Sequence, residues 1–513
     1  MMTKLFGSAV YGVEAITITI EVDFTKGISY SIVGLPDNAV KESLQRVESA
    51  IKNNGFIMPR ERVVINMAPA DIRKAGSAYD LPIAMGFLCG SGQANPDDVS
   101  KYIIMGELSL DGTIQPIKGA LPIAIQARKE GFIGLILPQQ NAREAAIVNN
   151  LKVYGVSHIN DVVAFLHDNT SIVPTFVDTR EEFNNAQYNF DIDFSDVKGQ
   201  ENIKRSLEIA AAGGHNAILI GPPGAGKTML AKRLPTILPP LSLQEALETT
   251  KIHSVAGKLP ENSTLISKRP FRSPHHTISD VALVGGGGNP APGEISLAHN
   301  GVLFLDELPE FKRQVLEVMR QPMEERRVTI SRAKVSIDFP SSFMLISSMN
   351  PCPCGYFNHP EKECSCPPGM VQKYLNKISG PLLDRIDLHV EVTPVKFSEL
   401  SGSTEGLEKS NAIRERVIKA REIQTERYKD LDGIYCNAQI NTQLLREYCQ
   451  LDTASQNLLK KAMERLNLSA RAYDRILKVA RTIADLAAAE NIRTEHIAEA
   501  IQYRSLDREN WGA

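Results

Sequence analysis

The chain has 513 residues, of which 43% are hydrophobic and 23% charged, and its formal net charge is −3. This balance excludes a polycationic nucleic-acid binder and leaves any such contact to a local patch or a lined channel. The length predicts about three domains. The N-terminus has no signal-peptide core and no apolar run approaches about 18 residues, so we expect a cytoplasmic protein outside the membrane. Seven cysteines, an odd number, argue against a disulfide framework.

Residues 1–168 have the pattern of an α+β domain. Apolar and polar residues alternate over 16–24, which predicts a half-buried strand, and 28–33 is a second strand that we expect to pair with it. Asp37 is placed to cap a helix, and further helices are expected over 78–89 and 120–129. Residues 169–190 are polar and unpatterned, which indicates a linker.

Two stretches of this first region, KAGSAYDL at 74–81 and GELSLDGTIQPI at 106–117, resemble the Lon protease domain, which has a ribosomal-protein-S5-like fold and a Ser–Lys dyad. The resemblance places Ala78 at the nucleophile position and Leu121 at the lysine position. Without a nucleophile and an amine to activate it, peptide cleavage has no chemistry. A shifted dyad of Ser77 and Lys118 stays open as an alternative to a folded regulatory or assembly domain.

Residues 191–398 contain a phosphate-binding loop. GPPGAGKT at 221–228 matches G-x-x-x-x-G-K-[ST] at each fixed position, between an apolar strand and a helix. Backbone N–H groups of such a loop surround phosphate oxygens, while Lys227 reaches the β- and γ-phosphates and Thr228 places a hydroxyl on Mg²⁺. The predicted ATP-binding residues of the loop are Gly221, Pro222, Pro223, Gly224, Ala225, Gly226, Lys227 and Thr228.

Two more buried strands are expected to end beside this loop. The apolar run 301–305 leads into Asp306, which would hold Mg²⁺, and Glu307, which would orient or deprotonate the attacking water. The run 343–349 leads into Asn350, whose amide can hold the attacking water or the γ-phosphate, the sensor-1 role. Open α/β sheets place their ligands at the carboxyl ends of parallel strands, so these side chains should converge.

The spacing of residues 193–200 resembles the adenine-pocket segment of AAA+ ATPases, which implies that Val197 and Gly199 lie against the base; a plain linker strand is the alternative. Arg385, in PLLDRID at 381–387, resembles the arginine finger that one subunit inserts into its neighbour's site, which would require a ring. The alternative is a surface arginine paired with Asp384 or Asp387.

Residues 399–513 are expected to form a helical lid. Ser469 is placed to cap a long amphipathic helix, and Thr494 to cap the last one. Arg471, in the first turn of the long helix, occupies the sensor-2 position of AAA+ proteins and would touch the γ-phosphate. Arg475 is the fallback candidate.

Four cysteines lie in an insert at 351–368: Cys352, Cys354, Cys364 and Cys366. Two C-x-C pairs of thiolates suit a structural tetrahedral Zn²⁺, and the insert has too few apolar residues to fold without it. Free thiols and an iron–sulfur cluster or redox pair remain alternatives. His359 is interpreted as a bystander.

Two segments of the ATPase region suggest contacts with a polymer. Alternation over 328–339 predicts a β-hairpin with a basic tip at 332–334. Residues 272–294 contain His275, His276 and four successive glycines, which exclude a stable helix or central strand. We interpret this segment as a mobile loop facing a ring channel, with metal ligation by the two histidines as a minor alternative.

In combination, SPHH at 273–276, the glycine run at 285–288, NPCPCG at 350–355 and GPLLDRID at 380–387 resemble the YifB/ComM family of bacterial Mg-chelatase-like AAA+ ATPases, related to MCM helicases. The resemblance implies a hexameric ring that uses ATP and Mg²⁺ to drive branch migration of branched or single-stranded DNA in natural transformation, as a helicase serving competence and recombination. The alternatives are a metal-chelatase motor subunit and an ATP-dependent protease or protein remodeller.

Overall fold

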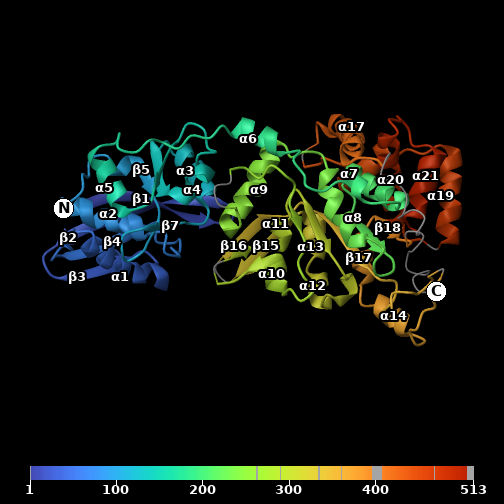
Figure 1. The fold of residues 1–513 in the computed structure, drawn as a ribbon, viewed down its shortest axis with the longest axis horizontal. Helices are drawn as coiled ribbons and strands as arrows, with labels where there is room; N and C mark the ends of the chain where they lie inside the picture. The colour runs from blue at the N-terminus through green and yellow to red at the C-terminus, as the bar shows by residue number, and fades with distance from the viewer. Residues whose placement is uncertain are drawn as a thin grey trace.

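The computed structural model describes residues 2–260, 264–288, 290–332, 335–359, 361–394, 407–431, 433–466 and 468–504, with backbone only at 332 and 335. Figure 1 shows a sheet built from the N-terminal third at one end of the molecule, a second sheet in the middle and the C-terminal helices at the other end. The expected boundary at 398/399 lies outside the described residues, and the domain limits at 168 and 190 stay predictions.

The N-terminal sheet has seven strands in the order β3-β4-β2-β1-β5-β8-β9. Helices α1, α2 and α3 occur at the expected places, and the Asp37 side chain accepts from the backbone N–H of Val40 as the predicted cap. The elements are β1 (Met2–Tyr11), β2 (Glu14–Thr25), β3 (Ser29–Val33), α1 (Asn38–Asn53), β4 (Arg62–Ala68), α2 (Asp80–Gly90), β5 (Tyr102–Ile104), β6 (Glu107–Leu108), β7 (Ile114–Gln115), α3 (Ala120–Lys129), β8 (Gly134–Pro138), α4 (Gln139–Ala145), β9 (Lys152–Val156) and α5 (Ile159–His167).

One expectation about this sheet is wrong, and one strand was missed. Strand β2 does not pair with β3; it pairs antiparallel with β1 and β4, and β3 joins β4 in parallel. Strand β1, which makes this arrangement possible, was not predicted. Its inward positions include Thr3, Leu5, Gly7 and Ala9, so small and polar residues hide the alternation that marks a strand.

The stretch expected to be an unpatterned linker contains helix α6 (Thr179–Ala186), capped by the Asp178 side chain. Phe183 is buried there in a small cluster with Leu241 and Ala246. A single aromatic side chain anchors this helix, and one apolar residue gives no periodicity to find in the sequence.

The central sheet has five parallel strands in the order β11-β14-β17-β10-β18, and both of its faces are buried as predicted. Successive residues of β10 alternate between faces: Ala217 and Leu219 belong to one core, Ile218 and Ile220 to the other. The first core also contains Ile413, Ile476 and Ile497, so the C-terminal helices share a core with one face of this sheet.

The expected hairpin is present as β15 and β16, paired antiparallel. Ser469 caps α20 as predicted, whereas Thr494 is the first residue of α21 and Arg493 occupies the cap position. The further elements are α7 (Glu201–Gly213), β10 (Ala217–Ile220), α8 (Lys227–Arg233), α9 (Leu243–Ala256), β11 (Phe271–Arg272), α10 (Asp280–Val284), β12 (Gly285–Gly286), β13 (Ala291–Pro292), α11 (Glu294–Leu297), β14 (Val302–Leu305), α12 (Arg313–Glu317), α13 (Arg320–Glu325), β15 (Arg327–Arg332), β16 (Val335–Pro340), β17 (Met344–Met349), α14 (Met370–Leu375), α15 (Gly380–Leu383), β18 (Leu388–Glu391), α17 (Ser410–Tyr428), α18 (Thr442–Tyr448), α19 (Thr453–Arg465), α20 (Ala470–Leu486) and α21 (Thr494–Gln502).

The two sheets are joined through contacts of α3 and α4 with α9. Ser254 of α9 donates its hydroxyl to the buried carboxylate of Glu144, which also accepts from the backbone N–H of Leu121 at 3.0 Å. The Gly119 N–H donates to the Ser254 carbonyl at 3.1 Å. At a second contact the Tyr11 hydroxyl, at the β1–β2 turn, donates to the Ser336 carbonyl of the hairpin at 3.4 Å.

The alternative dyad of Ser77 and Lys118 is not formed. Ser77 donates its hydroxyl to Glu107 instead. The stem of Lys118 lies against Gly257, next to the end of α9. With Ala78 and Leu121 at the resembled positions, the described residues of this region hold no Ser–Lys pair.

Within the part of the chain that the structure describes, no helix has both the length and the apolarity needed to cross a bilayer.

A buried carboxylate fixes the sheet to the C-terminal helices. Asp387, just before β18, lies 2.9 Å from a guanidinium nitrogen of Arg475 in α20 and 3.1 Å from Nδ1 of His215. It also accepts from the backbone N–H of Asn216 at 3.3 Å. Burial opposes ionisation of Asp387, but Arg475 and His215 outweigh it and hold its pKa well below the usual range.

Replacing Asp387 by Asn should lower the free energy of unfolding by about 3 kcal/mol, because Arg475, a partly buried cation, would lose its fully buried partner. A depressed native pKa stabilises the fold above the unfolded pKa and loses that effect as the pH falls towards the native value. Denaturant unfolding between neutral and acidic pH should therefore show a flatter acid-side loss in Asp387→Asn than in wild type. Equal slopes for the two proteins would contradict this assignment.

Candidate nucleotide and metal sites

The phosphate-binding loop connects β10 to α8 at the carboxyl end of the central sheet. Lys227 is buried, and its Nζ donates to the carbonyls of Gly221 at 2.6 Å and Pro222 at 2.9 Å and to Oδ1 of Asn350 at 3.1 Å. Burial lowers the pKa of Lys227, while the charges of Asp306 and Glu307 act in the opposite direction. The loop thus holds a desolvated cation that a phosphate can neutralise.

Asp306 follows β14 and meets the loop directly. Its Oδ2 accepts from the Thr228 hydroxyl at 2.7 Å, and its Oδ1 accepts from the hydroxyl of Ser348 in β17. A carboxylate and a hydroxyl are the ligand types that Mg²⁺ takes beside a phosphate. The residues present therefore fit the predicted Mg²⁺ position.

Glu307 has a left-handed backbone, with φ of 54°, which is uncommon for a residue with a side chain. Its carboxylate is 58% exposed and lies 3.7 Å from Nδ1 of His276. The predicted base is thus aimed outward, next to the segment that carries the two histidines. This contact connects the glycine-rich segment with the hydrolytic centre.

The predicted adenine segment lies beside the same loop. Val197 is buried in one core cluster with Ala225 and Leu230, and Gly199 has a φ of 65°. Gln200, which follows, donates its side-chain amide to the Thr393 carbonyl at 2.7 Å and to the Ala225 carbonyl at 3.4 Å. The segment is packed against the loop, unlike a plain linker strand.

Arg385 lies at the opposite edge of the sheet from the loop. Its carbonyl accepts from the side-chain amide of Asn216, the residue before β10, at 3.2 Å. At a rise of about 3.3 Å per residue, the length of β10 separates this edge from the phosphate loop by roughly 13 Å. The Arg385 guanidinium is only 13% exposed and pairs with Glu324, not with Asp384 or Asp387.

Arg471 and Arg475 lie with Arg385, away from the loop of their own chain. Arg471 contacts Asp384 at 3.1 Å, and its side chain is 69% exposed. Together with Lys478 the three arginines line a cavity of about 150 Å³. The expected sensor-2 contact therefore cannot be made within one chain in this arrangement, because the length of β10 intervenes.

The four insert cysteines form a compact cluster. All are free thiols, and their sulfur atoms lie within 4.8 Å of one another. The three distances among Cys352, Cys354 and Cys364 are 3.2, 3.7 and 3.5 Å. Four sulfurs about 2.3 Å from Zn²⁺ in a tetrahedron are about 3.8 Å apart, so the donor set fits a structural metal. His275, His276 and His359 lie outside this cluster.

The cysteine insert touches the phosphate loop. Gly355 has a φ of 86°, and a Cβ at this position would lie 2.5 Å from Cδ of Pro223. Only glycine accommodates both the backbone conformation and the close approach. The insert also begins directly after Asn350. The fold of the cysteine cluster therefore affects the position of both Asn350 and the phosphate loop.

The glycine run forms no helix or central strand, as expected: its first two residues form β12, which pairs antiparallel with β13 in a separate two-stranded sheet. Its mobility stays a prediction. The basic tip expected at 332–334 lies outside the described side chains.

Sequence reasoning missed two contributors to the site. Ser348 contacts Asp306, and its place two residues before Asn350, on the same face of a strand, was a usable signal. His276 was interpreted as part of a loop facing a ring channel, with metal ligation as a minor alternative, and nothing in its spacing pointed to Glu307.

Comparisons with known proteins agree with this geometry. Family models described as magnesium chelatase, subunit ChlI, as subunit ChlI of Mg-chelatase and as its C-terminal part match residues 193–400, 20–141 and 407–504. The competence protein ComM of Haemophilus influenzae is 43% identical over 98% of this chain and 97% of its own length. The YifB protein of Salmonella typhimurium is also 43% identical, over 98% and 96%.

The chain belongs to the ComM/YifB family of Mg-chelatase-like proteins. Family membership indicates an AAA+ ATPase that uses ATP and Mg²⁺ and assembles into oligomers. A shorter match joins the chain to Lon protease 2 of Bacillus subtilis, 31% identical over 28% of this chain and 27% of that protein.

Replacing Cys364 by Ser should abolish stoichiometric zinc in the purified protein and lower its melting temperature, because the insert has little apolar surface to hold it together. Elemental analysis and thermal unfolding measure the two effects. Cys449→Ser is the matched control, since Cys449 is buried far along the chain in α18's C-cap and outside the cluster. The zinc site would be contradicted if wild-type protein, expressed and purified with zinc present, contained no bound metal.

Proposed function

We propose that this protein forms a six-membered ring and is an ATP-driven motor that acts on DNA. The observation that carries the ring is the separation of Arg385 and Arg471 from the phosphate loop of their own chain. Three arginines and a lysine line one small cavity, where they face the carboxylates of Glu324, Asp384 and Asp474. Guanidiniums that leave these carboxylates are suited to the negative charge of a nucleotide bound to a neighbouring copy. Each site would then be completed by two subunits.

In this proposal, residues at both ends of the parallel strands take part in hydrolysis, those at the carboxyl end from the chain that binds the nucleotide. Lys227 binds the β- and γ-phosphates, and Asn350, bonded to Lys227, orients the attacking water or the γ-phosphate. Mg²⁺, when bound, neutralises phosphate charge, and Thr228, Asp306 and, behind them, Ser348 would hold it. Glu307 accepts the proton of the attacking water.

The neighbouring subunit supplies the remaining charge. Arg385 would leave Glu324 and approach the γ-phosphate, where a cation stabilises the charge that develops in the transition state. Arg471 would do the same from α20, with its exposed side chain free to move. Val197 and Gly199 would lie against the base on the loop side.

DNA is proposed as the load because of the sequence resemblance and because the Haemophilus relative is named a competence protein. The hairpin β15–β16 and the glycine-rich turn are the segments we assign to the polymer. The β1–β2 turn of the N-terminal region supports the hairpin through Tyr11 and Ser336, so this region would hold the contact surface in place.

The shared site predicts complementation between two inactive variants. Arg385→Ala and Glu307→Gln should each lower the ATPase rate by about 10³-fold, yet a mixture should recover activity, because an Arg385→Ala loop can meet the intact arginine of a Glu307→Gln neighbour. Steady-state hydrolysis of the separate and mixed proteins measures this. Arg493→Ala, on the exposed surface, is the control and should keep the wild-type rate. A mixture as inactive as its components would contradict the shared site.

A DNA load predicts that forked or single-stranded DNA raises the ATPase rate and that binding weakens steeply with salt. Hydrolysis and fluorescence anisotropy with a fork, a single strand and a blunt duplex test this over a salt series, with size measured in ATP. If the protein hydrolyses ATP but neither binds forked DNA nor responds to it, DNA is not its substrate, and only the proposal of an ATP-driven motor stands. Casein is the parallel substrate for the protein-remodelling alternative.

A further inference from the structure

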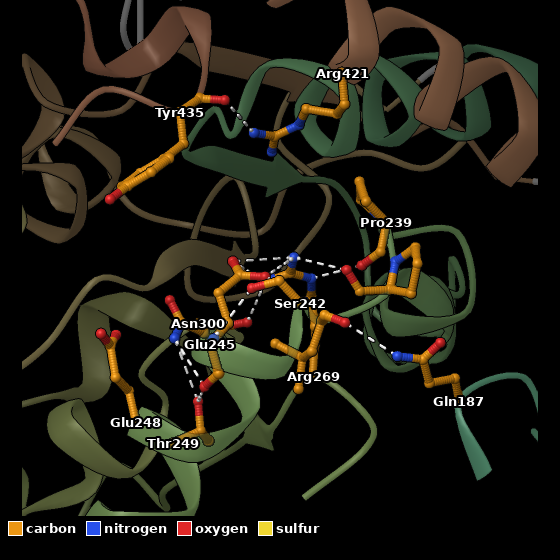
Figure 2. Close-up of polar contacts among 12 residues, drawn as sticks. Gln187, Pro239, Ser242, Glu245, Glu248, Thr249, Arg269, Asn300, Arg421 and Tyr435 are labelled. Atoms are coloured by element: carbon orange, nitrogen blue, oxygen red, sulfur yellow. Dashed lines mark hydrogen bonds and ion pairs between the residues drawn. The ribbon is translucent and has the colours of Figure 1, made fainter. Parts of the chain in front are cut away.

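A second cavity, of about 530 Å³, lies between the central sheet and the C-terminal helices. Gly214, Gly301 and Phe343 on its wall precede strands β10, β14 and β17, so the cavity lies at the amino ends of the strands, the opposite end from the phosphate loop. Figure 2 shows Arg421 and Tyr435 on one side of this region and the Arg269–Glu245 pair on the other. The volume is in the usual range for sites of small molecules.

One arginine of this cavity has a structural role. Arg269 pairs with Glu245 at 3.2 Å and donates to the carbonyls of Pro239 and Asn300, both at 2.7 Å. Its charge and its donors are satisfied within the protein (Figure 2). Arg269 and Glu245 therefore neutralise each other and form one wall.

Two further arginines on the wall have no carboxylate partner among the residues that the structure describes. Arg326 donates to the carbonyl of Gly433 at 2.8 Å. Arg421 donates to the carbonyls of Ala211 at 3.0 Å and Tyr435 at 3.5 Å. Main-chain carbonyls supply hydrogen bonds but no compensating charge, so two guanidinium charges facing one cavity are left unmatched.

The backbone at Arg326 is itself unusual. Its φ is 55°, a left-handed conformation at the end of α13 that a side chain rarely adopts. Burial lowers the pKa of Arg326, which shows that its environment disfavours an isolated cation. An anion in the cavity would relieve this.

A buried donor faces the same space. His299, 5% exposed, accepts from the backbone N–H of Ser342 through Nδ1 at 3.0 Å, which leaves the proton of the neutral ring on Nε2. Nε2 lies 3.5 Å from a carboxylate oxygen of Glu248, a residue of the same cavity wall, and has no other partner among the described residues. A ligand that accepts from this nitrogen has to displace Glu248.

The other walls are apolar or aromatic. Leu238, Phe343 and Met344 line the cavity, and the Tyr435 ring is 68% exposed at its border. Planar guanidiniums match the oxygens of a phosphate, and an exposed ring beside apolar surface suits a flat base.

We propose that this cavity is a second ligand site, distinct from the phosphate loop, which binds a nucleoside phosphate with its phosphates on Arg326 and Arg421 and its base against Tyr435. Arg326 belongs to the sheet region and Arg421 to α17, so the ligand would connect the two. The inference does not depend on the proposed DNA motor.

Calorimetric titration of the full-length protein tests this site with pyrophosphate and with ADP as probes. The Lys227→Ala variant serves as the parent protein, because it weakens binding at the phosphate loop. We expect saturable binding of both probes to this parent. Adding Arg326→Gln and Arg421→Gln should weaken both probes by about 10- to 100-fold, since two charge-assisted contacts are lost. Arg465→Gln, an exposed arginine of α19, is the matched control and should change neither.

Tyr435→Ala separates the two halves of the ligand. Because Tyr435 is exposed, its replacement should leave the fold intact, weaken ADP by about 10-fold and leave pyrophosphate unchanged. This variant also decides the matter if the double arginine variant does not fold. The site is refuted if neither probe binds the parent saturably, or if both bind the cavity variants as tightly as the parent.

Discussion

The buried ion pair of Asp387 with Arg475 is the constraint on which the arrangement of both halves of the motor rests. It joins the start of β18 to α20, while the backbone N–H of Asn216 and the ring of His215 bring in the segment before β10. A carboxylate removed from water is tolerated only with such partners, so none of these elements can shift alone. Arg385, two residues before Asp387, is thereby held at a fixed distance from the strand that ends in the phosphate loop.

That distance is the physical basis for the proposed division of the site between two subunits. A parallel sheet puts the carboxyl ends of its strands on one edge, and the loop, Asp306 and Asn350 gather there because each follows a strand. At the opposite edge, Arg385 lies between α15 and β18, and Arg471 and Arg475 lie in the first turns of α20. No rotamer of a side chain spans the roughly 13 Å of β10 between them. In the proposed mechanism, a chain with this topology completes the charges around the nucleotide by meeting another copy.

Much of this was accessible from the sequence, and the failures have physical causes. The loop, both acids and Asn350 follow buried strands whose apolar runs are unmistakable, and the caps at Asp37 and Ser469 are local. Strand β1 was missed because Gly7 and Ala9 give no alternation, and without it β2 and β3 were paired with each other. Helix α6 rests on the one buried ring of Phe183.

Contacts between distant segments were beyond sequence reasoning. The alternative to an arginine finger paired Arg385 with Asp384 or Asp387, its neighbours in the chain. Those carboxylates contact Arg471 and Arg475 of α20, and Arg385 pairs with Glu324. Proximity in the chain predicts ion pairs poorly when a helix from a distant part of the sequence brings its own cations to the same carboxylates. The cavity between the sheet and α17 was hidden for the same reason, since its arginines come from segments far apart.

The cysteine insert shows how such long-range contacts reach the chemistry. It starts at the residue after Asn350, and its Gly355 packs on Pro223. The insert is therefore joined to Asn350 through the chain and contacts the phosphate loop through space. An insert with few apolar side chains has no other means of holding this position than its four sulfurs. A metal that orders the insert therefore also restrains the phosphate loop. The stability of the insert and the geometry of the nucleotide site are thus coupled.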